Sequence, residues 1–299
     1  MIEKLLKDGW GYHDSESERL ALELESVSLS EVQDEHVTPL LTLISHTIGE
    51  HLNQWSRARE LSEHVFGTLG EGNRTSHQWA LVAVLRYMDF AMEEAQAAEL
   101  ESALNIEGNA LAAFITVKLM LAKALFSSNR FDEGLPIFKK VTALSSTQKE
   151  GSGSERVVAI SCNNIANDLL KLEDRTPIQD SIMLSAGEYA LAAWKKCGNW
   201  VNEERALYLL QLIQNTLGDT EKSLGYADYA LEIIKNEGPE PVDEAFIRLE
   251  KAKTYKRIGD SDNYELEITL ADNLAQLWDD ASLQSWYESE KSKLDLISA

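Results

Sequence analysis

The chain has 299 residues, of which 44% are hydrophobic, so it can form a substantial core in two ordinary domains or in one extended repeat array. Leu, Glu and Ala are the commonest residues, and strand-like runs of Val, Ile and Thr are absent, which predicts an all-α protein. The net charge of −22 argues against nucleic acid and against an anionic membrane surface as partners, because both attract basic proteins. We interpret the acidity as keeping an extended helical array soluble; the alternative is that it recruits a basic partner.

Cysteine usage and the start of the chain favour a cytoplasmic location. Cys162 and Cys197 lie far apart without metal-ligand spacing, as expected of small core residues in a reducing compartment. Residues 1–8 turn polar before a signal-peptide apolar stretch could form. No segment approaches the ~20 apolar residues that span a bilayer, so no membrane partner is expected.

The first third of the chain predicts short helices followed by irregular hairpins. Residues 1–34 are expected to form lead-in helices, and residues 35–104 degenerate helical hairpins, the first of them turning between positions 49 and 53. Residues 76–98 are strongly helical. The sequence leaves open whether this stretch folds back near Met92.

The remaining two thirds predict a more regular array. Residues 105–280 are expected to form repeated hairpins, and residues 281–299 a polar helix that caps the last edge. Residues 111–126 are almost continuously apolar, which predicts a helix buried on most sides. Residues 147–154 contain Gly151-Ser152-Gly153 and predict a long mobile loop, with a hinge between two sub-arrays as the alternative.

A helix-turn-helix pattern returns every forty-odd residues through the second half. The turn glycines Gly218 and Gly259 are each followed twelve positions later by a small residue, Ala230 and Ala271. Turns near positions 129, 174, 218 and 259 give spacings of 45, 44 and 41 residues. Such spacing predicts stacked hairpins that bury their apolar faces against their neighbours and leave a curved surface for binding.

These hairpins resemble the tetratricopeptide repeat, which combines small and aromatic residues with a Gly-Asp-type turn. The residues that carry the resemblance are Ala252, Tyr255, Gly259 and Ala271 in one repeat, Gly218, Asp219, Ser223 and Ala230 in another, Ala122, Asn129, Phe131, Gly134 and Phe138 in a third, and Asn53, Trp55 and Ala58 in a degenerate fourth. Asn163-Asn164-Ile165-Ala166 is similar to the start of a kinesin-light-chain-like repeat. The resemblance implies a superhelix of antiparallel helical hairpins, although the spacing exceeds the usual ~34 residues.

In such arrays the first helix of each hairpin lines a concave groove. The resemblance therefore implies groove positions at Lys123, Asn163, Asn164, Asn167, Arg205, Lys253, Lys256 and Arg257. An Asn amide both donates and accepts, and could grip the backbone of an extended peptide. Together with the cations, these residues would form a positive strip for a carboxylate or an acidic segment. The alternative is that they are solvated residues of helix faces.

The sequence contains no linear signature of catalysis. All six histidines precede residue 78, and the densest group is His46-Thr47-Ile48-Gly49-Glu50-His51. Two ligands on one α-helical face need i,i+4 spacing, whereas His46 and His51 are five apart, and Gly49 weakens the helix. These histidines are therefore interpreted as surface or interface residues, and neither a metal nor a cofactor is expected.

The function predicted from sequence is a non-enzymatic, cytoplasmic scaffold that binds a peptide segment in its groove. Two alternatives stay open. One is a peptide-responsive regulator whose superhelical twist changes on binding. The other is an enzyme with a non-linear site near the N-terminal histidines.

Overall fold

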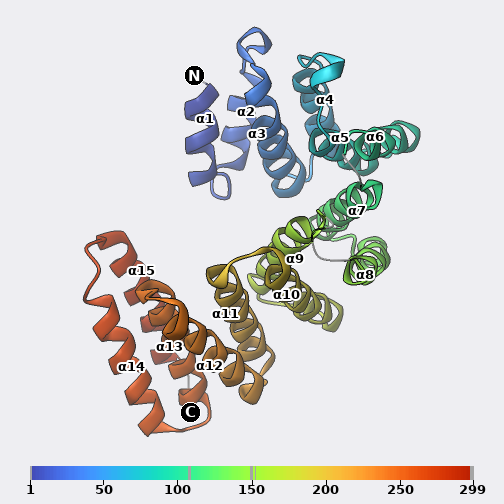
Figure 1. Cartoon of the computed structure of the whole chain (residues 1–299). Helices are drawn as coiled ribbons and strands as arrows, with labels where there is room; N and C mark the ends of the chain where they lie inside the picture. The colour runs from blue at the N-terminus through green and yellow to red at the C-terminus, as the bar shows by residue number, and fades with distance from the viewer. Residues whose placement is uncertain (1, 107–108, 149–150, 152, 297–299) are drawn as a thin grey trace. The chain divides into compact units, whose positions relative to one another are not determined.

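The computed structural model describes residues 2–106, 109–148, 151 and 153–296. Within these ranges every regular element is a helix and no strand occurs, which confirms the all-α prediction (Figure 1). The chain divides into two compact units, residues 1–161 and 162–299. The predicted loop at 147–154 includes positions 149, 150 and 152, which lie outside the described residues.

The first unit begins with short helices and ends in two hairpins. Its elements are α1 (Ile2–Asp8), η1 (Gly9–Gly11), α2 (Ser17–Glu25), η2 (Leu29–Glu31), α3 (Asp34–Ile44), η3 (Ser45–His51), α4 (Trp55–Phe66), η4 (Glu71–Asn73), α5 (Ser76–Met88), α6 (Met92–Leu104), α7 (Ala110–Ser127) and α8 (Phe131–Ser146). The next helix, α9 (Glu155–Leu170), contains the boundary between the units.

The second unit consists of longer helices. Its elements are α10 (Pro177–Cys197), α11 (Trp200–Leu217), α12 (Thr220–Glu237), α13 (Pro241–Arg257), α14 (Ser261–Ala275), α15 (Ala281–Ser292) and η5 (Lys293–Leu296). The predicted terminal helix is α15, which packs Tyr287 against Phe246 and Trp278. Helices that follow one another pair closely, α11 with α12 and α13 with α14.

The central helix of the first unit is α7. Among the described residues it is the one helix long and apolar enough to cross a membrane, yet 56% of it is buried. Val117, Leu121 and Leu125 join the same core as residues of α3 and α5. The prediction of a largely buried helix at this place is confirmed.

Four hairpins share one turn geometry. A single residue in each turn has a left-handed backbone: Phe90 (φ 61°), Asn129 (φ 59°), Gly218 (φ 82°) and Gly259 (φ 72°). The N–H of the next residue then donates to the carbonyl five positions back, over 2.8 to 3.0 Å. This is the Schellman ending of a helix, in which the left-handed residue lets the last carbonyls find donors. The stretch 76–98 is therefore a hairpin, and it turns at Phe90.

The four hairpins also share a packing register. The residue seven positions before the left-handed one is fully buried in every case, and so is the residue twelve positions after it. The earlier set is Ala83, Ala122, Gln211 and Ala252, and the later set is Ser102, Val141, Ala230 and Ala271, with no side chain more than 1% exposed. Mostly small side chains at these positions allow the two helices of a hairpin to approach closely.

The segment 45–51 differs from the expected turn. It is a π-helix, in which the N–H of Leu52 donates to the carbonyl of Thr47 five positions back at 3.1 Å. The chain reverses only at Asn53, which has a left-handed φ of 54°. The predicted turn at 49–53 is therefore found only at its end, because the helix continues with a wider turn as far as His51.

Candidate functional site

Of the eight predicted groove residues, Lys123 belongs to the first unit, where its partner is internal. Its ammonium lies 2.5 Å from Oε2 of Glu50, and both side chains are largely buried. Although burial alone raises the pKa of Glu50, the charge of Lys123 and the contact with His46 outweigh it and hold the pKa at about 2. Lys123 thus stabilises a buried carboxylate.

The two predicted arginines connect α11 with α13. Nε of Arg205 donates to Asp243 at 2.7 Å. Nη1 of Arg257 donates to the backbone carbonyl and to Oδ1 of Asn215, at 2.6 and 2.7 Å. These bonds link helices whose residues are 38 and 42 positions apart, so both side chains serve the packing of the second unit.

The other two predicted lysines, Lys253 and Lys256, also have acidic neighbours. Lys253 lies 3.2 Å from Oε1 of Glu250, and Lys256 lies 4.0 Å from Oδ1 of Asp295. Each of these cations therefore has an intramolecular carboxylate within 4.0 Å, and a positive strip that binds an acidic segment stays a prediction.

The predicted asparagines lie along α9. The amide of Asn167 donates to the backbone carbonyl of Asn163 at 2.9 Å, and the side chain of Asn164 is exposed. A bond of this kind, from a side chain to the preceding turn, accounts for an asparagine in mid-helix without a partner molecule. Recognition of a peptide by Asn163, Asn164 and Asn167 stays a prediction.

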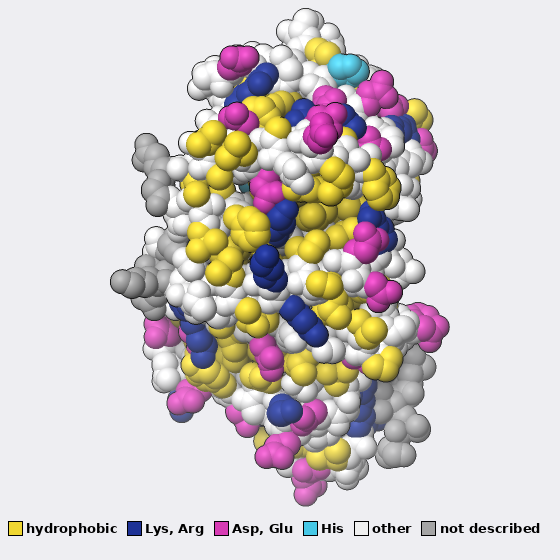
Figure 2. All heavy atoms as spheres, turned by 90° about the vertical axis from the view of Figure 1, so that its right-hand side faces the viewer, with side chains coloured by type: hydrophobic (Ala, Val, Ile, Leu, Met, Phe, Trp, Pro, Cys, Tyr) yellow, Lys and Arg dark blue, Asp and Glu magenta, His cyan; other side chains and the backbone are white. Residues whose placement is uncertain are grey.

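The first unit contains a cavity of about 580 Å³ that none of the eight predicted residues lines. It lies at the turn between α5 and α6 and along α7 and α8. Its lining residues are Tyr87, Phe90, Met92, Phe114, Lys118, Leu121, Leu125, Arg130, Glu133, Ile137, Lys140 and Val141. Figure 2 shows one face of the molecule, on which apolar side chains form broad patches with Lys and Arg side chains among them. A cavity of this volume with mostly apolar walls is typical of a ligand site.

Phe90 is the unusual residue of this cavity. It is 72% exposed although it is aromatic, and its backbone is left-handed. A bulky residue pays roughly 1–2 kcal/mol for that conformation, and the equivalent turns place Asn129, Gly218 or Gly259 there. The ring is mostly in solvent, and its contact with the Arg130 guanidinium, 5.0 Å from the ring centre, offsets only part of this cost.

Three cations line the same cavity and differ in how they are engaged. Lys118 donates to Glu99 at 2.7 Å and to the hydroxyl of Tyr87 at 3.1 Å. Arg130 forms a two-bond pair with Glu133, both bonds 2.7 Å. Nζ of Lys140 lies 6.0 Å from the ring centre of Phe114, and no ion pair joins it to any carboxylate of the described residues. Lys140 is therefore the cation best able to receive a carboxylate from outside.

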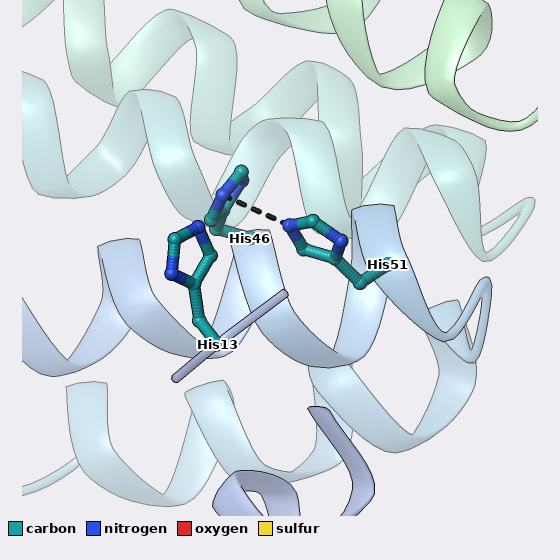
Figure 3. A group of neighbouring side chains, drawn as sticks. All are labelled: His13, His46 and His51. Carbon is teal, nitrogen blue, oxygen red and sulfur yellow. Dashed lines mark hydrogen bonds between the residues drawn. The ribbon is translucent and has the colours of Figure 1, made fainter. Parts of the chain in front are cut away.

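A second arrangement overturns the argument made from histidine spacing. His46 and His51 are five residues apart, but the π-helix hydrogen-bonds residues five apart and so places the two rings together. Their Nε2 atoms are 3.1 Å apart, and His13 joins them from the turn before α2 (Figure 3). The statement that these histidines cannot share a helical face is wrong, because it assumed an α-helix.

Neither the left-handed turn at Phe90 nor the pairing of His46 with His51 could be predicted from the periodicity of the sequence. A turn residue such as Phe90 has no Gly or Asn to mark it, and a π-helix has no established sequence pattern. Neither the comparison with protein-family models nor the comparison with curated proteins gives a match to this chain.

Proposed function

We propose that this chain is a non-enzymatic helical-repeat protein that binds a protein segment, and that the cavity at Phe90 receives the anchor of that segment. The proposal keeps the function predicted from the tetratricopeptide-like pattern but moves its centre to the first unit. The single observation that carries it is an exposed Phe90, held in a costly backbone conformation at the edge of an apolar cavity. Strain of this kind concentrates at functional sites.

The cavity's chemistry defines the partner. Phe114, Leu121, Leu125 and Val141 offer apolar walls for one large apolar side chain. Lys140 on the same wall can pair with a carboxylate. We therefore infer a segment in which an apolar residue stands next to Asp or Glu.

Selection from a random peptide library on the immobilised full-length protein tests this proposal. Enriched peptides should share an apolar residue followed or preceded closely by an acidic one. Lys140→Met should remove the acidic preference while keeping the apolar one. Absence of enrichment over a bead control, or a consensus rich in Lys and Arg, would contradict the proposal.

A substitution at Phe90 tests the site without disturbing the fold. Phe90→Asn replaces the ring with a residue that the equivalent turn of α7 and α8 already uses at Asn129. This variant should fold at least as well as the wild type and lose the selected peptides by tenfold or more. Unchanged affinity in Phe90→Asn would remove Phe90 from the site.

The groove predicted along α9 and the second unit is tested separately. Asn164→Ala together with Asn167→Ala should leave binding of the cavity-selected peptides unchanged. If instead this double variant loses them while Phe90→Asn keeps them, the groove is the site and the cavity is not.

A further inference from the structure

The histidine cluster near the N-terminus has the geometry of a metal site. One ligand nitrogen from each of His13, His46 and His51 lies within 4.8 Å of the other two. In Figure 3 the three rings face a common centre, from two different elements. Tetrahedral Zn²⁺ with Zn–N bonds of about 2.0–2.1 Å holds its nitrogens roughly 3.3 Å apart. The 3.1 Å between the Nε2 atoms of His46 and His51 is close to that separation.

Hydrogen bonds on the far side of two rings fix which nitrogen is available. Nδ1 of His13 lies 2.7 Å from the carbonyl of Trp10, and Nδ1 of His46 lies 2.5 Å from Oε2 of Glu50. A carbonyl and an ionised carboxylate only accept, so both Nδ1 atoms carry the proton. In the neutral rings each Nε2 then has a free lone pair. Metal-binding histidines are oriented in this way by carbonyl and carboxylate partners.

We propose that His13, His46 and His51 bind one divalent transition-metal ion, Zn²⁺ in the first place, through their Nε2 atoms. Imidazole ligands favour Zn²⁺ and its neighbours in the first transition row over Mg²⁺ and Ca²⁺, which prefer oxygen. The site is independent of the cavity at Phe90 and of what that cavity binds.

Asp14 lies near two of the three rings and could supply a fourth ligand. Its Oδ1 is 3.3 Å from Nε2 of His51 and 3.8 Å from Nε2 of His13. Three histidines with a carboxylate complete a tetrahedral set, and a water could take the same position because Asp14 is 63% exposed.

Binding needs a small rearrangement and a change of tautomer at His51. The Nε2 atoms of His46 and His51 share a hydrogen between them at 3.1 Å. A metal ion takes that place, so the proton leaves Nε2 of His51 while Nδ1 of the same ring takes one up from solvent, and the neutral ring binds through its Nε2 lone pair. His13 has to move inward by about 1–2 Å to reach a bond of ~2 Å. The side chains of His13, His46 and His51 are 20%, 23% and 27% exposed, so an ion can enter from solvent.

The bound ion would have a mechanical effect. His13 precedes α2, whereas His46 and His51 belong to η3, so one ion would connect the lead-in of the chain to the π-helix. The metal would then protect the segment around residues 9–16 from local opening, because binding stabilises the folded arrangement that it recognises.

The test is equilibrium dialysis of the full-length protein, stripped with a chelator, against Zn²⁺ in excess Mg²⁺, followed by metal analysis. Mg²⁺ occupies acidic surface sites, which matter in a chain of net charge −22. We expect one Zn²⁺ per chain. His51→Gln should weaken binding at least tenfold, whereas His64→Gln, an exposed histidine outside the cluster, should not change it.

Trp10 provides a second readout that does not depend on stoichiometry. Its ring centre lies 5.3 Å from that of His13 and 5.4 Å from that of His46. Co²⁺ should quench its fluorescence, and Trp10→Phe should remove the quenched component. The same Co²⁺ should give the visible absorption of a tetrahedral nitrogen site.

Two outcomes would overturn the proposal. One is a wild-type chain that retains no Zn²⁺ in the presence of Mg²⁺. The other is retention that is equal in His51→Gln, in His13→Ala and in the wild type. Because His13 lies in a turn, His13→Ala keeps the test valid if substitution within η3 disturbs folding.

Discussion

The indole ring of Trp55 lies against the backbone of Gly49 so closely that a Cβ there would stand 2.5 Å from Cζ3 of the ring. Trp55 is itself held in place, because its Nε1 is 3.0 Å from Oδ1 of Asn53 and 2.8 Å from Oγ of Ser128. The end of the π-helix is thus fixed to α4 and to the turn between α7 and α8.

Gly49→Ala should destabilise the protein on the order of 1–3 kcal/mol, because the added methyl overlaps a ring that cannot retreat. Chemical denaturation monitored by Trp fluorescence measures the loss. Gly72→Ala is the matched control, since a Cβ at Gly72 meets nothing within 4 Å. Equal stability of Gly49→Ala and Gly72→Ala would contradict the close packing.

Phe90→Asn should raise the free energy of unfolding by up to about 1 kcal/mol, since Asn tolerates the left-handed backbone that Phe resists. The gain is limited, because the contact between Phe90 and the Arg130 guanidinium, 5.0 Å from the ring centre, is lost. Phe90→Ala removes the ring but does not relieve the strain of the left-handed backbone, so it should be the less stable of the two variants. A Phe90→Asn chain clearly less stable than the wild type would show that the loss of the ring outweighs the relief of the backbone.

The carboxylate of Glu204 is fully buried, and neither of its oxygens has a hydrogen-bond partner in the described structure. Its nearest cation, Nε of Arg205, is 3.6 Å from Oε1. Burial, and next to it the carboxylate of Asp243, raise the pKa of Glu204 to about 9. A protonated Glu204 can donate to Asp243, and this contact exists only while the proton is bound.

The raised pKa of Glu204 determines whether the protein becomes more or less stable as pH rises. Between about pH 4.5 and pH 9 the folded chain holds a proton on Glu204 that the unfolded chain has released. Stability due to this group is therefore complete at low pH and falls as pH rises, by at most about 1.4 kcal/mol per pH unit. Glu204→Gln mimics the protonated form and should remove that slope.

Melting curves between pH 5 and pH 9 test this dependence. The melting temperature of Glu204→Gln should exceed that of the wild type by more at pH 8 than at pH 5. Glu221→Gln, which changes an exposed carboxylate on α12, is the control. A constant difference between Glu204→Gln and the wild type across this range would show that Glu204 is ionised throughout.

Ala230→Leu should cost about 1–3 kcal/mol, because Ala230 is fully buried where α12 crosses its partner. Asn236→Leu adds the same bulk at an exposed position of the same helix and should change stability little. Hydrogen exchange of α11 and α12 locates the effect. Protection that is equal in Ala230→Leu and Asn236→Leu would contradict a tight crossing at Ala230.

The sequence predicted the hairpins wherever the left-handed turn residue is a Gly or an Asn. Gly218 and Gly259 mark two left-handed positions, and Asn129 marks a third. The hairpin of α5 and α6 uses Phe90 at the same position, where propensity argues against a turn, so the sequence left that stretch undecided. The buried register around each turn then follows from the spacing of small residues.

The site was less predictable than the fold. The predicted cations were chosen by their position on a helix, but position does not tell whether a carboxylate from another helix is near. Asp243 pairs with Arg205 across 38 residues of sequence, which no local pattern contains. The histidine pair was rejected for a related reason, since the rule of i,i+4 applies only to the α-helical period.

A π-turn amounts to an α-helix lengthened by one residue. Without Gly49 the segment would read His46-Thr47-Ile48-Glu50-His51, with the two histidines four positions apart on one ordinary helical face. The gain or loss of a single codon therefore converts a π-helix that brings the two rings together into an α-helix that does the same. Among homologous genes, we expect insertions or deletions in this segment to occur together with changes in the number of its histidines.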